Sequence, residues 1–487
     1  MRHILTVVIA AAVAAPLAAA QPPPQAPPAA PGTIMKNKAP VSTEVLKVRL
    51  PKPQEAELPN GLHLMVLEDH RAPIINMQLL IEGAGGYYDP ADMPGLAGFT
   101  ATLMREGTAT KTSEQISQTL DRLAASLTTN ASISSPFAMV FGSGLSDQAD
   151  AMLAMMADVL QHPSFPPEEI ARYKTRMRAS LMAQRTQPAF LARERFQHVV
   201  FGDHPASRVS ATPAALDALT REALVAFHKA HYAPDHAVLA IAGDITVPQA
   251  RQKVEAALGG WNKAGAMIAP VQQPAPIAGP SVSLIARPNS VQTTLFVGTQ
   301  GIERTDPDYD ALTVANRVLG GGPSARLFER LREQKGYTYG AASTFSAGRY
   351  RGPWSASTDV RTEVTEPALT DLLDEIRQMR DTPVPENELG NMKRAIVTGF
   401  ARSLENPTSI VTSYLDSYVY KLPADYWDTY PDRIEKITAA DVQRVANKYW
   451  ATDRLQVVAV GDATKIEPAL AKVGAVQKFD TEGKAIK

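Results

Sequence analysis

An internal repeat constrains the fold of this chain more strongly than any other feature of the sequence. Residues 219–245 align without a gap with residues 437–463, so that Tyr232 corresponds to Trp450 and both copies contain a Gly-Asp pair near their end. Each copy has the pattern of a helix opened by threonine, a turn, a buried strand, and a Gly-Asp turn into another helix. The repeat therefore predicts that the chain folds as two similar halves.

A second and weaker echo extends the repeat toward the start of each half. Residues 64–81 resemble residues 283–298, and both segments have the pattern of an edge strand, a short break and a core strand. The pattern also predicts helices between the strands, at 113–127, 147–160, 168–184, 308–319, 366–380 and 386–403. We therefore predict an α+β fold with two homologous domains, each a mostly antiparallel sheet with helices packed on one face.

Composition divides the rest of the chain. Residues 1–20 open with a basic residue, continue with a short alanine-rich apolar run and end in three alanines, which is the pattern of a cleavable secretory signal peptide. Residues 21–40 are rich in proline and alanine and should form an extended, disordered linker. The two domains are then expected at 41–265 and 281–480, joined by a second proline-rich linker at 266–280. We expect export to a bacterial periplasm, or secretion beyond it.

The overall composition excludes several classes of function. With Cys at 0, neither a disulfide nor a thiolate zinc site can form. Lys+Arg number 49 against 50 for Asp+Glu, and no long basic run occurs, so we expect no nucleic-acid partner. No stretch after the signal peptide is long and apolar enough to predict a transmembrane segment.

The stretch 320–339 is the strongest candidate for function. Gly320, Gly321 and Gly322 give a backbone that can approach a ligand closely, and we expect this loop to be mobile and to bind substrate. A helix with apolar residues at helical spacing should follow the loop and end at Gly336.

The residues after this helix alternate like a strand, so Tyr337 and Tyr339 are expected on one face. A helix, a glycine turn and a returning strand can bring Arg332 and Tyr339 together. The pair would then offer a guanidinium and a phenol to a peptide carbonyl, or to the oxyanion formed from it. The spacing alone favours an ordinary amphipathic helix in front of a strand, with Arg332 solvated and Tyr339 half-buried.

This stretch resembles the second-half signature of the M16 peptidase family, which includes the pitrilysins, the insulysins and the mitochondrial processing peptidases. In that family a glycine-rich loop leads to a helix with an arginine, and a tyrosine follows seven residues later, at the positions of Arg332 and Tyr339. The resemblance covers about residues 57–478. It implies two M16-type domains that face each other around an internal chamber.

Active M16 peptidases also carry the motif H-x-x-E-H on an early helix. Its two histidines bind one zinc ion, its glutamate acts as general base, and a distant glutamate is the third ligand. The frame of this motif is present at 95–108, but Gly98 and Thr102 stand at the histidine positions and Ala101 at the position of the base. The usual region of the third ligand, 176–182, contains no carboxylate. We therefore expect a degenerate, non-functional zinc motif and no metal cofactor in this chain.

Other histidines do not replace the missing ligands. His228, His231 and His236 are close in sequence, and His198 and His204 flank a Phe-Gly-Asp segment. Neither group supplies the four ligands that a structural zinc site normally needs, so we expect no metal at either.

The resemblance implies a division of labour between two chains. We expect a non-catalytic subunit of a periplasmic heteromeric M16 metallopeptidase, inactive alone, whose Zn²⁺ lies on a homologous partner with an intact H-x-x-E-H motif. Arg332 and Tyr339 would be its catalytic residues, the three glycines its substrate-binding loop, and peptides its substrates. Two alternatives stay open: a structural or assembly protein of an envelope complex with no role in proteolysis, and a stand-alone enzyme with an unrecognised site.

Overall fold

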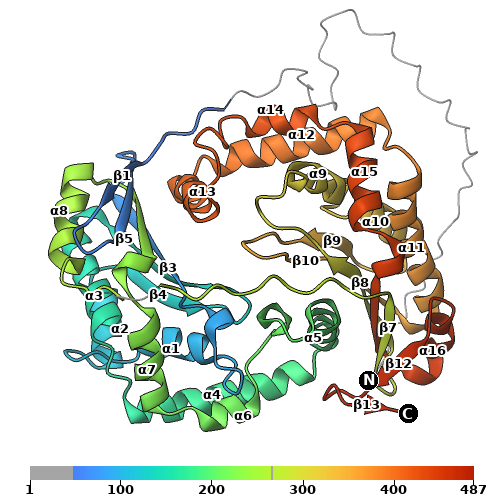
Figure 1. Cartoon of the computed structure of the whole chain (residues 1–487), viewed down its shortest axis with the longest axis horizontal. Helices are drawn as coiled ribbons and strands as arrows, with labels where there is room; N and C mark the ends of the chain where they lie inside the picture. The colour runs from blue at the N-terminus through green and yellow to red at the C-terminus, as the bar shows by residue number, and fades with distance from the viewer. Residues whose placement is uncertain (1–47, 265–266) are drawn as a thin grey trace, which may run out of the picture. The chain divides into compact units, whose positions relative to one another are not determined.

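The computed structural model describes residues 48–264 and 267–487, which belong to one compact unit spanning Val45–Lys487. The expected signal peptide at 1–20 and the linker at 21–40 lie outside the described residues. Two β-sheets, one in each half of the sequence, form the centre of the unit (Figure 1).

In the described part of the chain, the first sheet has six strands in the order β1-β2-β6-β3-β5-β4. The strands are β1 (Gln54–Glu57), β2 (His63–Glu68), β3 (Ile74–Glu82), β4 (Ser126–Ala131), β5 (Phe137–Leu145) and β6 (Ala237–Gly243). Neighbours pair antiparallel except β2 and β6, which run parallel.

The second sheet, counted over the same residues, has seven strands in the order β13-β12-β7-β11-β8-β10-β9. The strands are β7 (Ser281–Ala286), β8 (Gln292–Gln300), β9 (Ala341–Phe345), β10 (Pro353–Arg361), β11 (Gln456–Gly461), β12 (Val476–Phe479) and β13 (Ala485–Ile486). β7 pairs parallel with both β11 and β12, and the other neighbours pair antiparallel. The prediction of two mostly antiparallel sheets is confirmed.

The prediction that the strands beginning at residues 64 and 283 lie at the edges of their sheets is wrong. β2 lies between β1 and β6, and β7 lies between β12 and β11. In both sheets a short outer strand adds to the expected edge, and such short segments carry little periodicity from which they could be predicted.

The helices of the two halves follow the repeat. The first half contains α1 (Leu96–Met104), α2 (Ser113–Arg122), α3 (Ala149–Gln161), α4 (Pro167–Arg185), α5 (Pro188–Phe201), α6 (Pro213–Ala218), α7 (Arg221–His231) and α8 (Val247–Leu258). The second contains α9 (Tyr309–Leu319), α10 (Arg326–Phe328), α11 (Thr365–Asp381), α12 (Glu386–Ser403), α13 (Pro407–Tyr420), α14 (Tyr430–Lys436), α15 (Ala439–Tyr449) and α16 (Ala463–Ala471). Thr220 and Thr438 cap α7 and α15 at equivalent positions, which confirms the repeated helix start.

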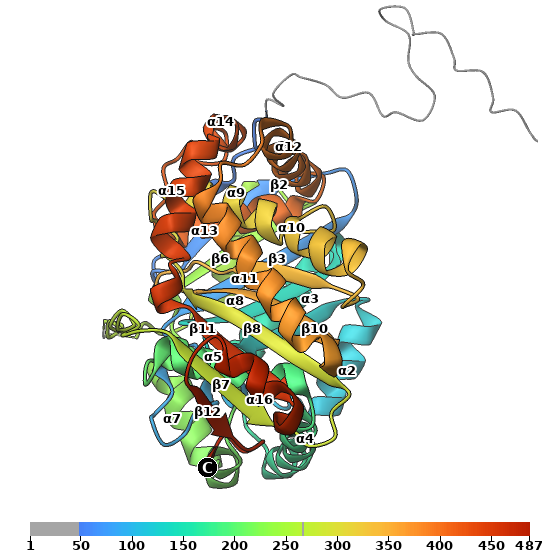
Figure 2. The ribbon, with the colours of Figure 1, turned by 90° about the vertical axis from the view of Figure 1, so that its right-hand side faces the viewer.

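Each sheet buries one face under helices of its own half. Side chains of β3 and β6 form a continuous core with α1, α3, α7 and α8. In the second half, α9, α11, α15 and α16 pack against β7, β8, β10 and β11, and Figure 2 shows α11 and α16 across this face.

The opposite face of each sheet is covered by a helix from the other half. Phe190 and Phe196 of α5 pack against Val458, Val460 and Phe479 of the second sheet. Figure 1 shows α5, in green, beside the strands of the second sheet, and α13, in orange, beside those of the first.

The reciprocal contact is made by α13. Its Ile410, Val411 and Leu415 pack against Met65 and Val238 on the first sheet. We call α5 and α13 the exchanged helices. As a result, each sheet packs between the helices of its own half on one face and one helix of the other half on the opposite face.

We predict that the exchanged helices are a main source of stability. Phe196 is buried and its ring lies 5.9 Å from that of Phe296. Replacing Phe196 by Ala leaves a cavity between the halves and should lower the free energy of unfolding by about 3–5 kcal/mol, measured by urea denaturation. Met182 on α4 is 68% exposed, so Met182→Ala should change it by less than about 0.5 kcal/mol. Equal urea midpoints for the two variants would contradict the assignment.

Candidate functional site

The helix that carries the degenerate zinc motif begins on a buried carboxylate. Asp89 accepts hydrogen bonds from the backbone N–H groups of Gly95 at 2.6 Å and Ala97 at 2.7 Å, and so fixes the first turn of α1. Burial raises the pKa of Asp89 to about 6, although these two hydrogen bonds and the charge of Arg208 oppose the rise. The two hydrogen bonds to Asp89 therefore fix the start of the helix that carries the motif positions.

The motif positions themselves offer no metal ligands. A Cβ at Gly98 would lie 3.2 Å from the carbonyl oxygen of Ala131 on β4, so α1 approaches this edge strand closely. Ala101 is buried, and its carbonyl accepts a hydrogen bond from the Thr129 hydroxyl at 2.6 Å. Thr102, half-buried, completes the set with one neutral hydroxyl.

The side of α4 that faces α1 is equally unsuited to zinc. Burial raises the pKa of Tyr173 to about 12, and a hydrogen bond with Thr102 and the charge of Arg176 oppose the rise. The guanidinium of Arg176 lies 3.9 Å from Glu106. Zinc requires imidazole, thiolate or carboxylate groups, and a tyrosine, a threonine and an arginine do not fit it. Among residues 48–264 and 267–487, no three His, Cys, Asp or Glu side chains gather as a possible metal site.

Two of the histidines considered in the sequence, His228 and His231, have structural contacts. His228 Nε2 lies 2.8 Å from the carbonyl oxygen of Leu160, and its ring stacks on Tyr232. His231 stacks on Phe227 with ring centroids 4.2 Å apart. Burial lowers the pKa of both histidines, so both are neutral packing residues at pH 7.

The glycine loop is packed more tightly than its sequence suggests. Gly320 accepts a hydrogen bond from the Ser343 N–H on β9, and a Cβ at Gly320 would lie 2.2 Å from that nitrogen. A Cβ at Gly321 would lie 2.8 Å from the Cα of Arg317, whose guanidinium donates to the Gly321 carbonyl. At Gly322 the three atoms nearest to a Cβ would all belong to the flexible guanidinium of Arg317, the first at 3.2 Å. Two of the three glycines therefore have a packing reason that the sequence did not predict.

The helix after the loop forms as predicted and ends in an unusual way. α10 continues directly into η5 (Glu329–Gln334), which has π-helical geometry, a form often found at functional sites. Leu331 is fully buried, while the Arg332 side chain is 45% exposed. The Arg332 guanidinium lies 4.7 Å above the ring of Phe328. Gly336 ends the helix with a φ of +60°, as its position predicts.

The prediction that Tyr337 and Tyr339 share one face of a strand is wrong, because β9 begins only at Ala341. After Gly336 the chain turns back, and the Tyr337 N–H donates to the carbonyl of Leu331. The segment up to residue 340 is thus held by the helix instead of pairing with β10. Tyr337 is half-buried, whereas Tyr339 is 91% exposed.

The Tyr337–Leu331 hydrogen bond returns the chain to the helix that carries Arg332, two residues before Tyr339. The side chains of Arg332 and Tyr339 both reach solvent, and neither makes a hydrogen bond with the other among the described residues. They are therefore available to a ligand or partner that approaches from outside the chain.

A cavity of about 400 Å³ adjoins the glycine loop. It lies on the face of β8, β9 and β10 that α5 partly covers, and Phe296, Phe328, Ser357 and Asp359 are among its walls. Sequence reasoning missed it, because Phe328 was counted only with the apolar stripe of its helix. The polar residues that alternate along β10 are the signal that could have indicated an open strand face.

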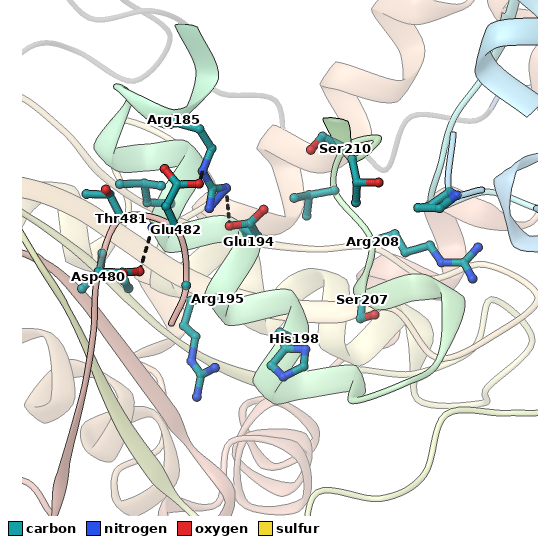
Figure 3. Close-up of a pocket in the computed structure, with 16 residues that line it drawn as sticks. Arg185, Glu194, Arg195, His198, Ser207, Arg208, Ser210, Asp480, Thr481 and Glu482 are labelled. Carbon is teal, nitrogen blue, oxygen red and sulfur yellow. Dashed lines mark hydrogen bonds and ion pairs between the residues drawn. The ribbon is translucent and has the colours of Figure 1, made fainter. Parts of the chain in front are cut away.

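A second cavity, of about 360 Å³, lies where α4 and α5 meet the turn between β12 and β13 (Figure 3). Arg185 donates to Glu194 at 2.5 Å, and its Nε lies 3.9 Å from a carboxylate oxygen of Glu482. The guanidinium of Arg195 lies 3.6 Å above the ring of Phe479. Because Arg185 pairs with Glu194 and Arg195 lies against Phe479, we interpret this cavity as part of a packed junction.

Comparisons with known proteins match both halves of the chain. The family model described as "Insulinase (Peptidase family M16)" matches residues 64–214, and the model described as "Peptidase M16 inactive domain" matches residues 218–396. An uncharacterized zinc protease of Streptomyces coelicolor is 26% identical over 367 residues, covering 73% of this chain and 79% of the relative. One from Rickettsia bellii is 24% identical over 413 residues, covering 83% and 96%.

Solved structures agree with these sequence matches. A crystal structure of a peptidase M16 inactive domain from Pseudomonas fluorescens has a TM-score of 0.78 at 29% identity, covering 84% of this chain and 98% of that chain. A protease from Helicobacter pylori has a TM-score of 0.78 at 16% identity, covering 85% and 100%, which shows the shared fold alone. Among the described helices, none has the length and apolar character needed to span a bilayer. With both M16 models matched in order along two homologous domains, the chain belongs to the M16 peptidase family.

Proposed function

We propose that this chain is the non-catalytic subunit of a heteromeric M16 zinc peptidase that degrades or processes peptides. It binds the peptide and stabilises the transition state, and a homologous partner with an intact H-x-x-E-H motif carries the zinc. The combination of a ligand-free motif on α1 with an exposed Arg332–Tyr339 pair supports this assignment most directly. The pattern of residues 1–20 supports the periplasm as its location.

The exposure of Tyr339 discriminates between the two main alternatives. If the chain were only a structural protein, Arg332 and Tyr339 would serve as packing residues. A tyrosine that is 91% exposed contributes almost nothing to packing, although its hydroxyl can donate to an incoming group. We therefore favour the peptidase subunit over the assembly protein.

The chemistry of the pair suits a peptide carbonyl. During peptide hydrolysis negative charge develops on the carbonyl oxygen, and fixed donors that point at this oxygen lower the barrier. The ring of Phe328 supports the Arg332 guanidinium from one side, which leaves its N–H groups directed along the edge of the plane. The phenol of Tyr339 supplies a second donor from the returning chain.

We predict that the chain alone is inactive and that its partner depends on it. The purified chain should contain far less than one zinc per molecule by metal analysis, and should not hydrolyse peptides, because α1 offers no ligand or base. Mixing it with an H-x-x-E-H homologue should raise peptide cleavage well above that of the homologue alone. A tightly held stoichiometric zinc in this chain, or a partner that is equally active alone, would contradict the proposal.

We predict that Tyr339→Phe lowers turnover of the reconstituted pair by about 10²–10³-fold, because one preorganised donor is lost. Arg332→Lys should also be damaging, because an ammonium cannot reproduce the planar guanidinium. Assembly, measured by size, should be unchanged for both. Tyr418→Phe removes a hydroxyl from another exposed tyrosine and should have no effect. Parental turnover of an assembled Tyr339→Phe pair would favour the assembly-protein alternative.

We predict that Gly322→Ala separates substrate binding from folding. The added methyl group lies nearest to the movable end of Arg317, so the Tm should stay nearly unchanged while KM of the reconstituted pair rises. Gly320→Ala, which collides with the β9 backbone, should instead lower the Tm. An unchanged KM for Gly322→Ala would show that this glycine has no part in substrate binding.

A further inference from the structure

The cavity beside the glycine loop carries one charged group on an otherwise neutral wall. Asp359 lies on β10 opposite Thr294 of β8, and its carboxylate accepts a hydrogen bond from the Thr294 hydroxyl. The other lining groups include the rings of Phe296 and Phe328 and the small side chains of the β9 edge.

The charge of Asp359 is not matched by a cation. Within the described residues no Lys, Arg or His lies within 4.0 Å of its carboxylate, and the residue is exposed on the open face of the sheet. The arginines on neighbouring segments lie next to other carboxylates and not next to Asp359. Arg332 lies on Phe328 with its Nε 3.4 Å from Glu333, and Arg361 pairs with Glu363 at 2.9 Å.

The shape and lining of the cavity then indicate the group it would accept. Two aromatic rings suit an aliphatic chain, and a carboxylate at the wall suits a positive charge at the end of that chain. Lysine and arginine side chains combine these two features. The volume of about 400 Å³ is within the range of ligand pockets.

We propose that this cavity binds a lysine or arginine side chain of the peptide, with its aliphatic part against Phe296 and Phe328 and its cationic end at Asp359. Gly340, which follows Tyr339, also borders the cavity, so the bound residue lies close to the Arg332–Tyr339 pair. The inference rests on the proposed function only in taking a peptide as the ligand. Asp359 would thus give the chain a preference for peptides that contain lysine or arginine.

The test uses the isolated full chain and two synthetic pentapeptides, Ala-Ala-Lys-Ala-Ala and its norleucine analogue, with blocked ends. The two differ by the ammonium group alone. We expect the lysine peptide to bind up to about fivefold more tightly by calorimetry, as an ion pair with an exposed carboxylate allows. The preference should shrink as salt concentration rises, because the site is exposed.

Substitution then assigns the preference to Asp359. Asp359→Asn keeps the shape and the acceptor for Thr294, and should bind both peptides with equal affinity. Asp453→Asn makes the same change of charge at a side chain that is 79% exposed, on the turn between α15 and β11, and should keep the parental preference. Melting temperatures of both variants check that the fold is intact.

Each outcome decides the proposal. Equal binding of both peptides to the parental chain, no binding of either at millimolar concentration, or a lysine preference that survives Asp359→Asn would overturn it. Binding is measured without a partner subunit, so it stays independent of proteolysis. A chain that prefers lysine but does not activate an H-x-x-E-H homologue would disprove the peptidase role and leave the side-chain site standing.

Discussion

The fold depends on one reciprocal contact, in which each half supplies the helix that covers the second face of the other half's sheet. α5 buries Phe190 and Phe196 on the second sheet, and α13 buries Ile410 and Leu415 on the first. Because of these exchanged helices, β6 and β11 are buried on both faces, and their sequences are nearly continuous apolar runs. Neither half can bury its own sheet completely, so we infer that the two fold and unfold together.

The same contact positions the candidate site. α5 covers only part of the face made by β8 and β10, and Ala189 at its start borders the cavity beside the glycine loop. The hairpin of β9 and β10 is also tied to the first half, because Arg349 in its loop forms an ion pair with Glu82 at the end of β3. The β9–β10 hairpin beside the glycine loop is therefore held by α5 and by the Arg349–Glu82 ion pair. Tyr339, in the adjoining turn, is exposed to solvent.

The sequence predicted those features of the fold that interactions between residues close in the chain determine. The repeat, the threonine caps and most of the predicted helices are confirmed, since a cap or an amphipathic stripe acts within a few residues. The helix predicted at 113–127 is too long, because α2 ends at Arg122 and residues 126–127 already belong to β4. The exchanged helices were not among the helices predicted, because the partners of Phe196 and Leu415 lie far away in the sequence. The strand predicted at Tyr337 and Tyr339 does not form, because the hydrogen bond between Tyr337 and Leu331 holds this segment against the helix despite its alternating sequence.

The two candidate regions, one in each half, differ in the side chains that they present. In the first half, Asp89 still fixes the start of α1, yet the positions that follow it hold a glycine, an alanine and a threonine that pack against β4 and α4. Packing these three neutral residues carries no desolvation cost for a charged group, so we interpret this region as structural. In the second half, the Arg332 guanidinium pairs with Glu333 at 3.4 Å, and the side chains of both Arg332 and Tyr339 reach solvent. Under the proposed function, the exposure of Arg332 and Tyr339 makes the second half the one that contributes to the chemistry.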